Sequence, residues 1–195
     1  KKAAFSDQAG VEALQFWVDL IHKEKVAPKE PADPEEAFRT GKLSMHVNGP
    51  WMINLFKEQP NLNFKVAPMP LIGKNRAVWG DAHLMCIPKQ PKEQTEATLT
   101  FVKWISDHSI EWAKAGQVPV RQTIINSKEF AALTEQYEYS KQLPYVQFLP
   151  QSERWSEIEG VLLEYMDAAY LERSTPDKIL SEAAEEVNDI LARRR

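Results

Sequence analysis

Residues 41–51 read GKLSMHVNGPW, and this stretch combines the signals that decide the fold. From Leu43 to Val47 apolar and polar residues alternate, which is the period-2 pattern of a half-buried strand. Gly49 and Pro50 then favour a helix start, because proline suits the first helical position. Ligands of α/β sheets bind beyond the carboxyl ends of strands, where helix N-termini offer free N–H groups. The stretch therefore predicts a strand-to-helix corner that faces a ligand.

Composition describes an ordinary globular chain of 195 residues, 43% hydrophobic and 27% charged. The formal net charge of -4 gives no general attraction for phosphate backbones, so we expect no nucleic-acid partner. No apolar run reaches the roughly 18 residues that span a bilayer. The single cysteine, Cys86, excludes an internal disulfide, and its apolar neighbours predict a small buried side chain.

The periodicity outside the corner predicts an α/β fold that is helix-rich towards the C-terminus. Alternating or compact apolar runs predict further strands at 62–66 and 84–87, in a fold with about four short strands. Helical spacing predicts among others helices from Asp7 to about Glu24, from 93 to 106, and two long ones after Ser152 and Thr175. The first ten residues contain no signal-peptide core and no Met, so we interpret the chain as a piece of a longer protein.

No stretch carries the motif of a built active site or of a metal or cofactor site, and the four histidines are scattered singly. We therefore expect no metal and no cofactor. Asp81 is the one carboxylate that stands apart, in a turn before the predicted strand at 84–87. It could serve a glycosidase, which would need a second carboxylate across a cleft. Its alternative role is a turn residue that binds its own backbone.

Tryptophan positions are more informative than the carboxylates. Trp17 and Trp104 fall on apolar helix stripes and are predicted to be core residues. Trp51, Trp79 and Trp155 each lie where a loop meets the end of an element. An indole at such a junction can expose a face on which the C–H face of a sugar stacks. The alternative is that all three are further hydrophobic anchors.

Several segments, in this order, resemble the family-1 extracellular solute-binding proteins, the sugar-capturing components of bacterial ABC importers of the maltose-binding-protein type. They include EEAFRTGKLSMHVNGPW, FKVAPMPL, WGDAHLMCIPK and FVKWISDHSIEWAKAGQVPVR. The resemblance covers the C-terminal half of such a protein. It implies a periplasmic-binding-protein type II-like lobe, α/β in class, and a C-terminal fragment of a two-lobe protein that closes on its ligand about a hinge.

The resemblance also implies how the chain divides between two lobes. Residues 1–78 would form the first part of the second lobe. Residues 79–125 would hold the hinge crossing and a segment of the first lobe, and residues 126–195 would return to the second lobe. Without the rest of the first lobe, the apolar surface of 79–125 would need a partner, through rearrangement or a swapped dimer.

Carried over by position, the resemblance makes Trp51 a sugar-stacking residue, puts the turn at 79–81 at hinge and cleft, and puts Trp155 on the far cleft wall. Many relatives have a second glycine where Asp81 stands, which favours a side-chain contact here. The ligand-binding residues implied are Trp51, Trp79, Gly80, Asp81, Trp155 and Arg121, with Asn48 and Arg154 as weaker candidates.

The function implied is capture of an oligosaccharide, without catalysis, for delivery to the membrane subunits of an ABC permease. The location implied is extracellular or periplasmic, with a lipoprotein anchor in the full-length protein. Two alternatives stay open on the residues: a glycoside hydrolase fragment that uses Asp81, and a binding protein of the same fold for a peptide or polyamine. A cationic ligand would want several acidic cleft residues, and the sequence offers only Asp81.

Overall fold

The computed structural model describes residues 2–29 and 33–193, which form two compact units. The helical unit comprises residues 1–32 and 150–195, and the mixed unit comprises residues 33–149. These divisions differ from the predicted lobe boundaries after residues 78 and 125. The assignment of these segments to two lobes stays a prediction. Within the described residues no helix combines the length and apolarity needed to cross a membrane.

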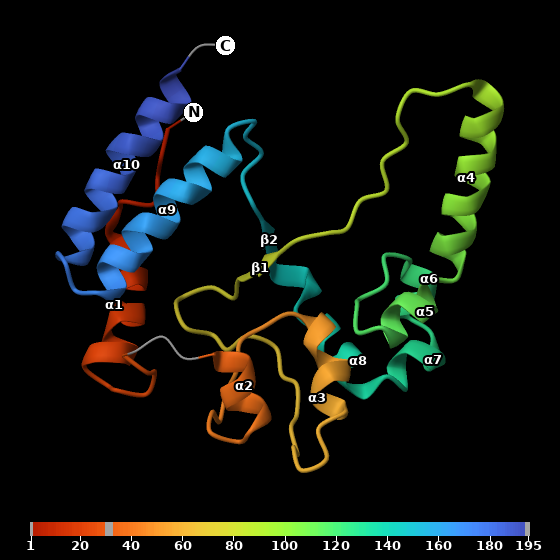
Figure 1. Ribbon diagram of the computed structural model, residues 1–195, viewed down its shortest axis with the longest axis horizontal. Coiled ribbons are helices and arrows are strands. Elements are labelled where there is room, and N and C mark those ends of the chain that lie inside the picture. Colours follow the sequence, from red (N-terminus) through yellow and green to blue (C-terminus); the bar gives the residue numbers. More distant parts are fainter. Residues whose placement is uncertain (1, 30–32, 194–195) are drawn as a thin grey trace. The chain divides into compact units, whose positions relative to one another are not determined.

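The helical unit is a bundle of α1 (Gln8–His22), α9 (Trp155–Tyr170) and α10 (Pro176–Ala192) (Figure 1). The stripes predicted from helical periodicity face its interior, except that Met166 of α9, predicted to point inward, is exposed. Its core consists of Leu14, Val18, Ala169, Ile179 and Leu180 in one cluster and Ile158, Val161, Val187 and Ile190 in another. Ile179, Ala183, Val187 and Ile190 of α10 are all buried and recur at helical spacing, so the pattern in the sequence and the packing agree on this helix.

Helix caps were only partly predictable. Pro176 occupies the first position of α10 after Thr175, as predicted. Ser6 was the predicted N-cap of the first helix, but α1 begins one residue later, because the Asp7 carboxylate accepts a hydrogen bond from the Gly10 N–H at 2.9 Å. A carboxylate at a helix N-terminus also interacts favourably with the helix dipole, which helps to explain why Asp7 is the N-cap and Ser6 is not.

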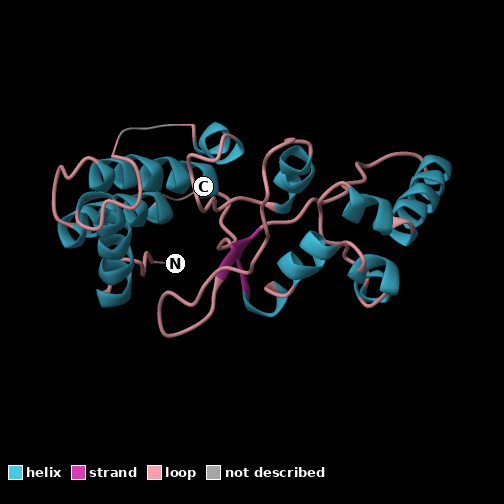
Figure 2. Ribbon diagram, turned by 90° about the horizontal axis from the view of Figure 1, so that it is seen from below, coloured by secondary structure: helices cyan, strands magenta, loops and turns pink. Residues whose placement is uncertain are grey.

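The mixed unit has many short elements and a small sheet (Figure 2). Strands β1 (Val78–Gly80) and β2 (Val146–Phe148) pair in parallel, with Trp79 opposite Gln147. The helices, with η for 3-10 turns, are α2 (Pro34–Arg39), η1 (Pro50–Met52), α3 (Ile53–Lys57), α4 (Lys92–Asp107), α5 (Ser109–Lys114), α6 (Gln122–Ile125), α7 (Lys128–Ala131), α8 (Thr134–Ser140) and η2 (Leu143–Tyr145).

The strands predicted at 43–47, 62–66 and 84–87 are not present; these segments lack regular secondary structure. The alternation was real, but a strand exists only where a neighbouring strand takes its backbone hydrogen bonds. None of the three segments pairs with another in the described part of the chain. Cys86 is exposed and not buried as predicted, and its neighbour Leu84 has 82% of its surface exposed.

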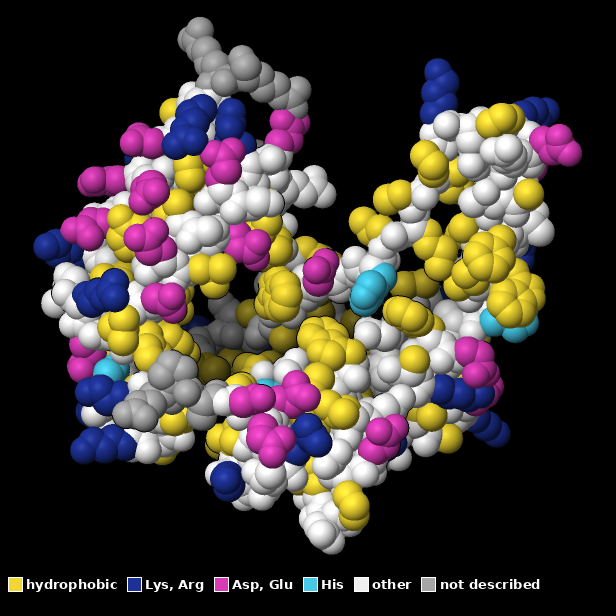
Figure 3. All heavy atoms as spheres, in the orientation of Figure 1, with side chains coloured by type: hydrophobic (Ala, Val, Ile, Leu, Met, Phe, Trp, Pro, Cys, Tyr) yellow, Lys and Arg dark blue, Asp and Glu magenta, His cyan; other side chains and the backbone are white. Residues whose placement is uncertain are grey.

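Helix α4 was predicted correctly in its extent and wrongly in its packing. It has no buried residue, and Trp104, predicted to be a core residue, is 58% exposed. Leu99 and Phe101 on the same helix are also more than half exposed. Hydrophobic side chains accordingly gather on the surface of this part of the mixed unit (Figure 3). An amphipathic helix whose apolar side is uncovered lacks the packing that normally stabilises it.

The interior of the mixed unit is aromatic. The rings of Phe38, Phe56 and Phe64 contact one another, with centroids 4.9 to 6.3 Å apart, and His46 joins them at 5.7 Å from Phe38. Phe130 of α7 is completely buried. These contacts hold the segment before the corner in place, because His46 lies three residues before Gly49.

An ion pair between α3 and α8 predicts a pH-dependent contribution to stability. Lys57 Nζ lies 2.6 Å from Glu135 Oε2. Burial acts to raise the pKa of the Glu135 carboxyl, but the hydrogen bond from Lys57, a backbone hydrogen bond and the Lys57 charge lower it below its ordinary 4.5. Because the folded-state pKa is the lower one, the contribution is complete above about pH 4.5 and is lost as the pH falls through the folded value.

We therefore expect Glu135→Gln to reduce the free energy of unfolding by about 0.5 to 1 kcal/mol at neutral pH, since the pair is partly exposed. Urea unfolding at pH 7 and pH 3 measures this difference, which should be smaller at the lower pH because the carboxyl is protonated as the pH falls through its lowered folded-state pKa. Lys57→Met is the matched control, and the double variant should lose little more than either single one. An equal loss at both pH values would contradict the assignment.

Candidate ligand-binding site

The strand-to-helix corner of the sequence is a loop-to-helix corner in the structure. Gly49 is the N-cap and Pro50 the first residue of η1, as predicted, and α3 continues from it. Pro50 is buried, whereas Trp51 is 53% exposed. A Cβ atom on Gly49 would lie only 2.0 Å from Cζ3 of Trp51, so the indole covers Gly49 closely. The corner therefore holds one face of the Trp51 ring and leaves much of the ring exposed.

A second loop supports this corner from the end of α5. The Asn54 amide donates a hydrogen bond to the Lys114 carbonyl at 2.9 Å. Gly116 has φ +104, and a Cβ there would lie 2.5 Å from the Pro50 carbonyl oxygen. Only glycine combines this backbone conformation with such a close approach of two chain segments. The sequence predicts Gly116 as the end of a short helix from Ser109 to Ala115, because a glycine just after a helix signals a left-handed end, but it does not show the contact with Pro50.

We expect Gly116→Ala to displace the corner and to cost about 1 to 3 kcal/mol of unfolding free energy, from backbone strain and the clash with Pro50. Gly73→Ala is the matched control, because nothing lies within 4 Å of the Cβ it would add. Thermal unfolding gives the cost, and a change in tryptophan emission that is absent when Trp51 is replaced by phenylalanine reports the displacement. If the Gly116→Ala and Gly73→Ala variants were equally stable, Gly116 would not be needed for the close approach to Pro50.

Asn48 is exposed, and its side chain makes two local hydrogen bonds. Its Oδ1 accepts from the Gly49 N–H at 2.7 Å, and its Nδ2 lies 3.0 Å from His46 Nε2. The amide is thus oriented before any ligand is present. His46 was not among the predicted site residues, and its two-residue spacing from Asn48 in an extended segment is the signal that could have indicated it.

The turn at Trp79, Gly80 and Asp81 follows from strand β1. Trp79 is 61% exposed. A Cβ on Gly80 would lie 2.3 Å from Val146 Cγ1, so glycine permits the close pairing of β1 with β2. The exposed Asp81 accepts a hydrogen bond from the Ala82 N–H at 2.7 Å, which is the turn-forming role weighed in the sequence analysis. Contact of Asp81 with a ligand stays a prediction.

Arg121 is held at the end of α4. Its Nη2 lies 2.7 Å from Asp107 Oδ1, and its Nε donates to Ser106 Oγ at 2.9 Å. The pKa of the Asp107 carboxyl is lowered, first by the hydrogen bond from Lys103 and also by the charges of Arg121 and Lys103, against an opposing effect of burial. The charge of Arg121 is therefore balanced by Asp107. A ligand contact would be made by the guanidinium N–H groups that Asp107 and Ser106 do not use.

The two other predicted residues, Arg154 and Trp155, belong to the helical unit. Trp155, at the start of α9, packs partly buried against the core cluster that contains Ile158. The Arg154 guanidinium lies 2.9 Å from Glu157, which also pairs with Arg193. Six of the eight predicted residues thus share the mixed unit, and these two share the helical unit.

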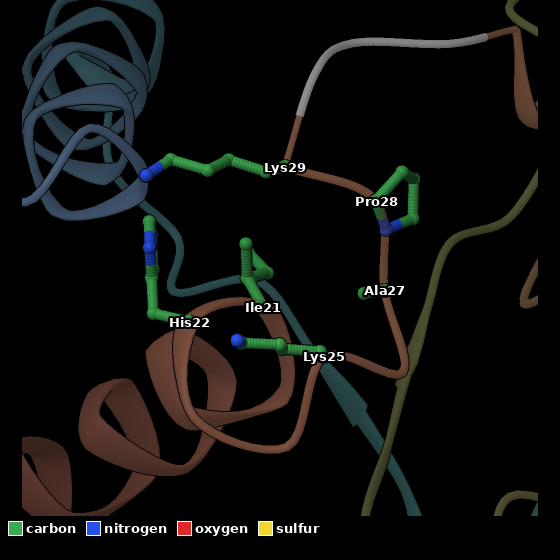
Figure 4. A pocket seen from close by; sticks show the side chains of 6 residues that line it. All are labelled: Ile21, His22, Lys25, Ala27, Pro28 and Lys29. Carbon is green, nitrogen blue, oxygen red and sulfur yellow. The ribbon is translucent and has the colours of Figure 1, made fainter.

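A cavity of about 450 Å³ lies in the helical unit, and none of the predicted residues lines it. Figure 4 shows its lining, which consists of Ile21, His22, Lys25, Ala27, Pro28 and Lys29. Both ring nitrogens of His22 are occupied, one by Glu172 at 2.9 Å and the other by the Tyr170 carbonyl at 2.8 Å. Across the described residues no three His, Cys, Asp or Glu side chains gather as a metal site would require.

Similar proteins place the chain among binding proteins. It is 26% identical to a binding protein of Brucella abortus (strain 2308), covering 97% of this chain and 48% of that protein. It is 24% identical to the maltotriose-binding protein of Pyrococcus abyssi (strain GE5 / Orsay), covering 80% of this chain and 37% of that protein. The chain thus spans about half the length, or less, of these curated relatives.

The fold is that of a solved solute-binding protein. The crystal structure of the cyclic α-maltosyl-1,6-maltose binding protein of Arthrobacter globiformis matches with a TM-score of 0.80 at 21% identity, covering 97% of this chain and 50% of that one. This confirms the predicted fold class, a helix-rich lobe of the periplasmic-binding-protein type. The profile of the bacterial extracellular solute-binding proteins matches residues 1–137. The chain therefore belongs to the family of bacterial extracellular solute-binding proteins.

Proposed function

We propose that the full-length protein binds an oligosaccharide outside the cytoplasmic membrane and delivers it to the membrane subunits of an ABC permease. The observation that carries this proposal is the half-exposed indole of Trp51, held over Gly49 at a helix N-terminus in a family of solute-binding proteins. One relative is named for binding maltotriose, and one protein of the same fold for binding cyclic α-maltosyl-1,6-maltose, which supports an oligosaccharide ligand. A lipoprotein anchor in the full-length protein would keep it at the membrane surface.

Exposed indoles suit a sugar for a physical reason. An open indole leaves apolar area in water, and covering it is worth roughly 1.5 to 3 kcal/mol. Trp51 and Trp79 are both more than half exposed, so each could gain this energy from the C–H face of a sugar ring. The exposed polar groups of Asn48 and Asp81 would bind hydroxyls, and Trp155 and Arg154 would be further ligand contacts.

The alternatives are less well supported. A glycosidase that uses Asp81 would need a second carboxylate, and the carboxylate of Asp81 already accepts a hydrogen bond within its turn. The family is one of binding proteins and not of enzymes. A peptide or polyamine ligand would want several acidic groups, whereas the predicted residues offer Asp81 alone beside two arginines.

The lobe division is part of the proposal. Residues 79–125 would complete one lobe together with the half of the protein that this chain does not span, and 1–78 with 126–195 would form the other. The uncovered apolar side of α4 and the exposed Leu84 and Met85 support this, because a soluble protein normally covers such surface. A swapped dimer of this chain would cover the same surface in another way.

Hydrogen–deuterium exchange tests the lobe division. In the full-length protein, α4 and residues 81–88 should exchange far more slowly than in this chain alone, while α10 should differ little. Light scattering on this chain distinguishes a monomer from a swapped dimer. Exchange at α4 that is equally fast in both forms would contradict the division.

The function is tested by titrating the full-length protein with maltose, maltotriose and a cyclic tetrasaccharide while tryptophan emission is recorded. We expect saturable changes with at least one sugar, no effect of spermidine or a tetrapeptide, and no release of reducing ends. X-ray scattering on the same samples should show a smaller radius of gyration with ligand if the lobes close. Release of reducing sugar would favour the hydrolase, and binding of spermidine alone would favour the cationic ligand.

A further inference from the structure

The side chain of Asn48 is oriented by a neighbour that can only donate. The Gly49 N–H donates to the Asn48 amide at 2.7 Å, so the atom facing it must be the carbonyl oxygen Oδ1. This settles which end of the amide is which, because an NH₂ group cannot accept that bond. The NH₂ end, Nδ2, is therefore the atom that lies 3.0 Å from His46 Nε2.

This orientation determines where the proton of His46 lies. An amide NH₂ donates and cannot accept, so Nε2 of His46 must be the acceptor and carries no proton. We infer that His46 is a positioning residue, neutral with its proton on Nδ1, which orients the Asn48 amide at the corner before Trp51. The role of His46 in ligand binding rests on the proposed function. The assignment of its proton rests on the two hydrogen bonds alone.

The imidazole is itself held in place by aromatic packing. Its centroid lies 5.7 Å from the Phe38 ring and 5.9 Å from the Phe56 ring, and it is half-buried. Phe56 is buried in the mixed unit, so the imidazole of His46 packs against the interior of that unit. The aromatic cluster therefore holds His46 in place, and the hydrogen bond from Asn48 to His46 in turn fixes the Asn48 side chain.

The orientation of the Asn48 side chain determines which of its hydrogen-bonding groups are free to contact a ligand. With one N–H directed to His46 and one lone pair occupied by Gly49, Asn48 keeps one N–H and one carbonyl lone pair. A hydroxyl group both donates and accepts, and adjacent hydroxyls of a sugar could use both free positions at once. A cation could use only the lone pair. The orientation therefore favours, beside Trp51, a ligand that both donates and accepts, such as a sugar with adjacent hydroxyls, over a cation.

The test uses the full-length protein, the probe maltotriose and three substitutions. His46→Phe keeps an aromatic ring between Phe38 and Phe56 and removes the acceptor. His46→Gln places an amide oxygen near the position of Nε2, and His46→Asn places one near Nδ1 instead. Because one hydrogen bond contributes about 1 kcal/mol, we expect His46→Phe and His46→Asn to weaken binding about fivefold and His46→Gln to stay within about twofold of wild type.

Long-range ¹⁵N NMR of the imidazole reads the tautomer directly, with the His46 signals identified by their loss in His46→Phe. We expect an unprotonated Nε2, a protonated Nδ1, and a shift of the Asn48 side-chain amide signals in His46→Phe. A proton on Nε2, or equal binding by all three variants, would overturn the inference. If wild type binds neither maltotriose nor any other sugar, the proposed function fails, and the NMR result still decides the orientation. Thermal unfolding identifies a variant that has lost its fold. If His46→Phe fails to fold, the affinities of His46→Gln and His46→Asn are compared with each other instead.

Discussion

Replacing Trp51 by alanine in the full-length protein is expected to weaken oligosaccharide binding by about 10- to 100-fold. The ring is half exposed, is held over Gly49 and packs little into the interior, so its removal should affect the ligand more than the fold. Loss of one stacked face is worth roughly 1.5 to 3 kcal/mol, and each 1.4 kcal/mol is tenfold in affinity. Isothermal titration calorimetry with maltotriose measures the loss.

Phe16→Ala is the matched control, because Phe16 is an exposed aromatic residue in the middle of α1 and not at the end of an element. It should leave the affinity unchanged. Trp155→Ala should also weaken binding, together with some loss of stability because Trp155 packs against the Ile158 cluster. Equal affinities for the Trp51, Trp155 and Phe16 variants would refute the assignment of the site.

The largest expected effect on stability is that of Phe130→Ala. Phe130 is completely buried in the mixed unit, and its ring lies 6.3 Å from that of Tyr137. Deleting a buried phenyl ring removes its transfer free energy and leaves a cavity, so the mixed unit should lose about 3 to 5 kcal/mol. Urea unfolding, followed by hydrogen exchange in the mixed unit, measures the loss separately from the helical unit.

The control for this prediction is Phe101→Ala, the same substitution on a ring that is 61% exposed on α4. In this chain it should cost less than about 0.5 kcal/mol. In the full-length protein it should cost clearly more, if residues 79–125 complete the first lobe as proposed. A cost for Phe130→Ala no larger than that for Phe101→Ala in this chain would contradict the position of Phe130 in the core.

Local signals in the sequence predicted the helices well. The apolar stripe of α10 and the proline that begins it act within a few residues, so neighbours along the chain are enough to specify them. The corner at Gly49 and Pro50 was predictable for the same reason. The ligand role of the eight predicted residues was inferred from family resemblance and remains a prediction.

Signals that depend on a distant partner failed. The alternation at 43–47 and the apolar run at 84–87 predicted strands, but in the described part of the chain no neighbouring strand takes their hydrogen bonds. β1 and β2, which do pair, come from segments far apart in the sequence. Trp104 was misplaced because a stripe shows which side of a helix is apolar, and does not show whether anything covers it.

The sequence by itself thus determined most helix extents, the helix start at Gly49 and Pro50 beside Trp51, and the family of the protein, because these follow from short-range patterns and motif order. Only the tertiary structure decided that Gly116 bears on Pro50, that His46 orients Asn48, and that α4 exposes its apolar side. The physical reason is that clashes, hydrogen-bond directions and burial depend on which segments meet in space, and the corner acquires its shape from those neighbours.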